Sequence, residues 1–133
     1  MQSLSAGALY FAAVFAAGFV LGVLRTLVLL PRIGPLLAVL VELPIILGFA
    51  WLVSARILRL LRLSSAEAAG MGAVAFALLM LGETAISTLL SSRSLAEHLS
   101  MYAQLPHALG LAGQVAFAAF PRIQARRSRA RPA

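Results

Sequence analysis

Four strongly polar residues interrupt the long apolar stretches of this sequence, one in each stretch. They are Arg25, Glu42, Glu83 and Gln114. A carboxylate in such a place can pair with a guanidinium, hold a proton or bind a cation, and a side-chain amide can donate and accept hydrogen bonds beside it. An unpaired charge in an apolar stretch is costly, so these residues are the first candidates for function.

The four residues also lie at similar depths. Counted along each stretch at 1.5 Å per residue, all of them are roughly 9 to 12 Å from the same side. We therefore expect an intramembrane polar cluster in which Arg25 pairs with Glu42, with Glu83 or with both, and Gln114 lies at its edge. The alternative is an ion-pair network that fixes helix register without any further role.

Other residues near the cluster suggest how it is built. Gly18 and Gly22 form a GxxxG pair, which predicts close helix packing. Pro44 removes a backbone donor and predicts a kink beside Glu42. His107 is expected at the outer rim, where a solvated residue at a helix start is more common than a ligand.

The composition requires elements that cross a membrane. Of the 133 residues, 62% are hydrophobic and 11% are charged, and the mean hydropathy is +0.97. A soluble domain carries about twice that charged fraction. Each apolar stretch is long enough to cross roughly 30 Å of hydrocarbon. The absence of cysteine excludes disulfides and thiolate metal sites.

The predicted fold is all-α, a transmembrane bundle of four helices in a single domain, residues 1–123. Prolines and a glycine in "PRIGP" end the first span, and "SSAE" is a capping box before the third. A second capping box, Ser94 to Glu97, and an apolar face over Leu95, Leu99 and Tyr102 predict a short interfacial helix before the fourth span. The expected spans are 4–30, 36–54, 66–90 and 107–121.

The first stretch has a second reading as a cleaved signal peptide. It lacks a basic leader and continues well past 15 apolar residues, which favours a span. Residues 124–133 are predicted to form a basic, disordered cytoplasmic tail.

Arginine placement predicts the orientation. Eight of the 11 arginines lie after the second span or in the tail, at Arg56, Arg59, Arg62, Arg122, Arg126, Arg127, Arg129 and Arg131. The positive-inside rule then places both termini in the cytoplasm, in a multi-pass protein of a bacterial inner membrane.

The run "GVLRTLVLLPRIGPLLAVLVELPIIL", Gly22 to Leu47, resembles a pattern of small four-span bacterial membrane proteins. The shared pieces are the arginine that ends the first span, "PRIG" in the turn and "ELP" in the second span. Glu83 in "LGETAIS" matches an acidic residue of the third span in that group. The resemblance implies that the arginine and the glutamates belong together, and it implies no activity.

Three functions are compatible with these observations. The first is an accessory or scaffold subunit, or a homo-oligomer, held together by the buried charges. The second is a transport or proton- or cation-conducting unit that uses Glu42 and Glu83, with Arg25 as counter-charge. The third, an intramembrane enzyme, lacks a recognisable catalytic set.

We expect no cofactor and no metal site. The expected partners are the lipid bilayer, further copies or a larger membrane complex, and anionic lipid at the C-terminal arginines, with no nucleic acid.

Overall fold

The computed structural model describes residues 1–131, and these residues contain helices but no strand. In order, the elements are α1 (Gln2–Leu24), η1 (Arg25–Leu29), α2 (Leu30–Leu61), α3 (Ser65–Leu90), α4 (Leu95–Ser100), η2 (Met101–Ala103) and α5 (Leu105–Ala130). η1 is a π-helical segment and η2 a single 3₁₀ turn. The all-helical fold predicted from the sequence is confirmed.

The first long helical run folds back on itself at Gly34. This glycine has φ 79° and ψ 171°, a backbone conformation that side chains disfavour, and it breaks the helical backbone inside α2, four residues after α2 begins. Helical structure therefore passes the first proline of "PRIGP" and stops three residues later than expected. Pro44 also lies inside α2, where the backbone keeps helical dihedral angles.

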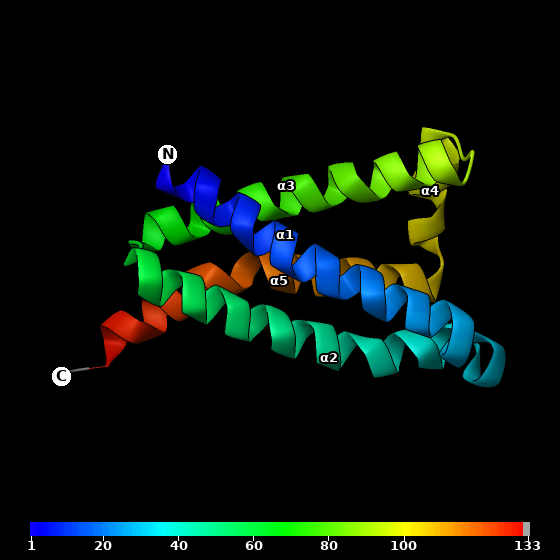
Figure 1. Cartoon of the computed structure of the whole chain (residues 1–133), viewed down its shortest axis with the longest axis horizontal. Helices are drawn as coiled ribbons and strands as arrows, with labels where there is room; N and C mark the ends of the chain where they lie inside the picture. Colours follow the sequence, from blue (N-terminus) through cyan, green and yellow to red (C-terminus); the bar gives the residue numbers. More distant parts are fainter. Residues whose placement is uncertain (132–133) are drawn as a thin grey trace.

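The four long helices pack side by side. α1 contacts α2 and α3, and α5 contacts the same two helices from the other side (Figure 1). Both described chain ends lie at one end of the molecule, and the α1–α2 turn and α4 lie at the opposite end (Figure 1). We call these the terminal end and the turn end.

The helix boundaries follow from local chemistry. Ser64 caps α3 and Ser94 caps α4, each through a complete capping box with the glutamate three residues on. Both boxes were predicted. α2 ends at Leu61, and the next residue, Arg62, adopts a left-handed conformation with φ 50°.

The packed core occupies the terminal end. Tyr10 of α1 is fully buried, its hydroxyl donates to the Phe117 carbonyl of α5 at 2.9 Å, and the two rings stack with centroids 4.3 Å apart. Two glycines permit close backbone approach. A Cβ on Gly7 would meet Val74 at 2.6 Å, and one on Gly72 would overlap the Ala118 carbonyl.

α5 continues to Ala130, which contradicts the disordered tail predicted for residues 124–133 as far as the structure describes them. Gln124 is buried, and its amide donates to the Trp51 carbonyl at 2.9 Å. The Arg127 guanidinium lies 5.7 Å from the centre of the Trp51 ring. These contacts with α2 hold the helix in place as far as Ala130. Residues 132–133 of the predicted tail lie outside the described residues.

The surface of the helices is apolar. Two helical runs, Gln2–Leu61 and Ser65–Leu90, are long and apolar enough to cross a membrane, and only 11% of the most apolar window of each is buried. A core helix of a soluble protein is mostly buried, whereas here large side chains such as Leu52 (68% exposed) and Leu89 (80% exposed) point outward. The outer surface of these helices therefore consists mainly of apolar side chains.

Candidate functional site

The turn end of the molecule contains a cavity of about 1300 Å³. Side chains of α1, η1, α2, α3 and α5 form its walls, and α4 and η2 contribute Glu97, His98 and Tyr102. All four polar residues singled out in the sequence line this cavity. The molecule is thus divided between a packed core at the terminal end and a partly polar cavity at the turn end.

Glycines leave room for the cavity. Gly18, Gly22 and Gly110 all line it, and a Cβ on Gly110 would meet nothing within 4 Å. The GxxxG pair was predicted to pack against a neighbouring helix. Instead, the nearest atom to a Cβ on Gly18 would be the Ile46 side chain at 3.9 Å, so close helix approach belongs to other glycines.

Arg25 and Glu42 form an ion pair within one helical hairpin. Nη1 of Arg25 donates to Oε2 of Glu42 at 2.7 Å. The π-helical turn begins at Arg25, and the Thr26 hydroxyl bonds the Gly22 carbonyl at 2.8 Å beside it. The pair joins the end of α1 to α2. The Glu42 side chain is 12% exposed and that of Arg25 is 37% exposed.

Glu83 has different partners. Nε2 of Gln114 donates to Oε1 of Glu83 at 2.6 Å, which joins α5 to α3. The Tyr102 hydroxyl donates a long hydrogen bond of 3.4 Å to Oε2. Within residues 1–131, Glu83 forms no ion pair. Each of its oxygens therefore has a neutral donor.

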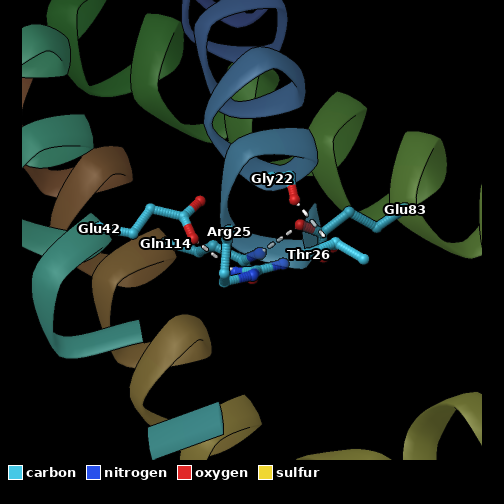
Figure 2. A network of polar contacts seen from close by, with 6 residues as sticks. All are labelled: Gly22, Arg25, Thr26, Glu42, Glu83 and Gln114. Carbon is cyan, nitrogen blue, oxygen red and sulfur yellow. Dashed lines mark hydrogen bonds and ion pairs between the residues drawn. The ribbon is translucent and has the colours of Figure 1, made fainter. Parts of the chain in front are cut away.

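Figure 2 shows the two pairs side by side at one level of the molecule. Glu42 approaches from α2 and Glu83 from α3, with the side chains of Arg25 and Gln114 between them (Figure 2). The sequence left open whether Arg25 would bind one glutamate or both. The structure pairs it with Glu42 and leaves Glu83 to the amide.

Tyr102 and His98 extend the polar contacts toward α4. The Tyr102 hydroxyl lies 3.5 Å from Nε2 of His98, and the two rings meet edge to face with centroids 5.6 Å apart. Burial, and then the charge and hydrogen bond of Glu83, raise the pKa of Tyr102 above its usual value. The phenol therefore remains protonated at neutral pH and acts as a donor.

Several buried polar atoms that line the cavity have no hydrogen-bond partner in the protein. They are the Ser87 hydroxyl, Nδ1 of His98, Nδ1 of His107 and Oε1 of Gln114. His107 was expected at a solvated rim, yet its ring is half-buried in the cavity wall. A buried polar group without a partner costs free energy, and such groups gather at binding sites.

Sequence reasoning did not select His98 or Tyr102 for the site. Tyr102 was assigned to the apolar face of the interfacial helix. Their approach to Glu83 depends on α4 folding back over the end of α3, which the capping box at Ser94 begins but does not direct. The signal available was the co-occurrence of His98 and Tyr102 one helical turn apart.

No protein-family model, curated protein or solved structure matches this chain. The described residues form an all-helical fold with an apolar exterior and a partly polar cavity at the turn end.

Proposed function

We propose that this chain is a four-span bacterial inner-membrane protein with both termini in the cytoplasm. The exposed arginines that end α2, including Arg56 and Arg59, and those that end α5 lie at the terminal end together with both described chain ends. A basic end opposite a cavity end fits the positive-inside rule. The cavity then opens within the outer half of the bilayer.

α5 is proposed as the fourth span although its hydropathy is lower than that of the others. His107, Gln114 and the terminal arginines reduce its apolar character. It is 26 residues long, or about 39 Å, and it packs against both α2 and α3. If those two helices cross the bilayer, α5 crosses with them, and its His107 and Gln114 line the cavity.

We further propose that the cavity binds a small cation, and that the protein moves it or exchanges it for a proton. One observation carries this proposal. Glu83 is a carboxylate in an intramembrane cavity, and its hydrogen-bond partners, Gln114 and Tyr102, are both neutral. A negative charge in hydrocarbon needs a positive partner, so a cation or a proton completes the site.

The rest of the lining favours an organic cation over a bare metal ion. Phe15, Phe19, Phe117 and Tyr102 line the same cavity as Glu83. Aromatic faces attract cations that have already lost most of their water, such as protonated amines and quaternary ammonium groups. The volume is ample for a drug-sized molecule, which occupies a pocket of about 300 to 1000 Å³.

The Arg25–Glu42 pair takes a different part in this proposal. Its two charges neutralise each other and join α1 to α2 next to the cavity. Glu42 therefore helps to hold α1 against α2 beside the cavity. Glu83 supplies the negative charge that no cationic side chain of residues 1–131 pairs with.

The accessory or scaffold hypothesis remains a second proposal. It was based on buried charges that specify assembly, and here the one ion pair of the described residues lies within a single chain. Assembly with other chains stays a prediction. A stoichiometric foreign chain in native mass spectrometry of the extracted protein would favour it.

Flux measurements test the transport proposal. Liposomes that contain the purified protein should accumulate the lipophilic cation tetraphenylphosphonium when a pH gradient is imposed across their membrane. Glu83→Gln should abolish this flux and preserve the helical content, because the amide keeps the shape but not the charge. Equal flux in wild type and Glu83→Gln would contradict the proposal.

A further inference from the structure

A second hollow lies on the outside of the molecule, between α3 and α5 at the terminal end. Its volume is about 440 Å³. Small or apolar residues line most of it, namely Ala69, Ala73, Val115, Ala118, Ala119 and Ile123, and Arg122 and Arg126 complete the lining. It is separate from the Glu83 cavity and shares no lining residue with it.

The groove is built into the packing of the two helices. The Ala118 carbonyl of α5 lies so close to Gly72 of α3 that a Cβ there would overlap it. This contact brings the backbones together beneath the groove, and the alanines on either side leave it unfilled. Most of its lining is apolar, which suits a hydrocarbon chain.

The two arginines at the groove lie one helical turn apart. Residues i and i+4 of a helix project from the same face, so Arg122 and Arg126 form one basic pair. Both are exposed, and neither forms an ion pair within residues 1–131. Two guanidinium groups at this spacing match a phosphate, which they can bind through paired hydrogen bonds.

The acidic side chains, all of which lie within residues 1–131, do not neutralise this pair. Glu42 is bonded to Arg25 and Glu83 to Gln114. Glu67 and Glu97 are engaged in the capping boxes of α3 and α4. These are all of the acidic residues of the chain, so the positive charge at the groove is available to an external anion.

We propose that this groove is a binding site for an anionic phospholipid of the cytoplasmic leaflet. Its acyl chain lies between α3 and α5, and its phosphate is held by Arg122 and Arg126. The inference uses the membrane location and orientation proposed above but does not depend on cation binding at Glu83.

Native mass spectrometry of the full chain tests this site. The protein, extracted in mild detergent, is titrated with phosphatidylglycerol and, in parallel, with phosphatidylcholine. Wild type should retain more phosphatidylglycerol than phosphatidylcholine. The double variant Arg122→Gln, Arg126→Gln should lose about tenfold or more in apparent affinity for it, because two charges near the headgroup are removed.

Two further variants separate a built site from general attraction to positive charge. The control Arg56→Gln, Arg59→Gln removes two charges at the same end, outside the groove, and should keep wild-type retention. Ala73→Phe fills the groove and leaves both arginines, and it should weaken lipid retention with the fold unchanged by circular dichroism.

Three results would overturn the proposal. If both double-arginine variants lose the same affinity for phosphatidylglycerol, the lipid is attracted by the general positive charge of this end and not by a site in the groove. Full retention by Ala73→Phe would exclude the acyl chain from the groove. A dimer peak that Ala73→Phe removes would assign the groove to a second copy of the chain. None of these outcomes bears on Glu83, whose cation binding is measured separately.

Discussion

Gln114 of α5 donates a hydrogen bond of 2.6 Å to Glu83 of α3, and no cationic side chain within residues 1–131 pairs with that glutamate. One helix pair is thus joined through an amide and a carboxylate, while the neighbouring pair is joined by a complete ion pair at 2.7 Å. Two glutamates at one level of the molecule therefore have different electrostatic surroundings. The following predictions depend on that difference.

Removing the arginine of the ion pair should destabilise the hairpin. Arg25→Gln leaves the mostly buried Glu42 carboxylate unpaired, and we expect a loss of about 1 kcal/mol or more in unfolding free energy. Adding Glu42→Gln should partly restore stability, whereas adding Glu83→Gln should not. Thermal unfolding in detergent measures all three. If Glu83→Gln restores the stability of Arg25→Gln instead, Arg25 pairs with Glu83 and not with Glu42.

Gly72 of the packed core and Gly110 of the cavity should respond differently to a methyl group. Gly72→Ala places a Cβ against the Ala118 carbonyl, and overpacking of this kind costs about 1 to 3 kcal/mol. Gly110→Ala meets nothing within 4 Å and should be neutral or slightly stabilising, since alanine favours helix. Comparison of the two unfolding midpoints checks this, and similar midpoints would contradict the division into core and cavity.

The titration of Tyr102 should report its approach to Glu83. Burial and Glu83 raise the pKa of Tyr102, so its phenolate should form only above the usual value of about 10. Glu83→Gln removes the smaller cause and keeps the larger, so the pKa should fall but remain raised. Carbon-13 NMR of labelled tyrosine follows both tyrosines, and Tyr10 provides the internal reference. If Glu83→Gln leaves the pKa of Tyr102 unchanged, the Tyr102 hydroxyl does not interact with the Glu83 carboxylate.

The end of α5 should be held by Trp51. Arg127→Gln removes a cation–π contact worth about 0.5 to 1 kcal/mol and should change the fluorescence emission of Trp51, the one tryptophan of the chain. Arg129→Gln removes the same charge two residues later and should leave the emission unchanged. Identical spectra for wild type and Arg127→Gln would place the tail away from α2.

Sequence periodicity and local chemistry account for the helices and their caps. Serine followed three residues later by glutamate predicted the starts of α3 and α4, because a capping box is satisfied within four residues. The end of α5 was mispredicted for the converse reason. Its order depends on Gln124 and Arg127 reaching Trp51, more than 70 residues away, and composition carries no information about that contact.

The sequence predicted which four polar residues belong to the site, but not which of them pair with each other. Counting depth along each apolar stretch brought the four polar residues to one level. Depth alone does not give the rotation of each helix, and rotation decides that Arg25 faces Glu42 while Gln114 faces Glu83. The same limit applies to Gly18 and Gly22, whose spacing suits helix packing but whose face lines the cavity.

Equilibrium binding of tetraphenylphosphonium to the purified protein is the most direct test of cation binding at Glu83. Wild type should bind it. Glu83→Gln should abolish binding, while Glu67→Gln, which removes a carboxylate at the opposite end and keeps a capping side chain, should bind as wild type does. Undiminished binding by folded Glu83→Gln would contradict the account.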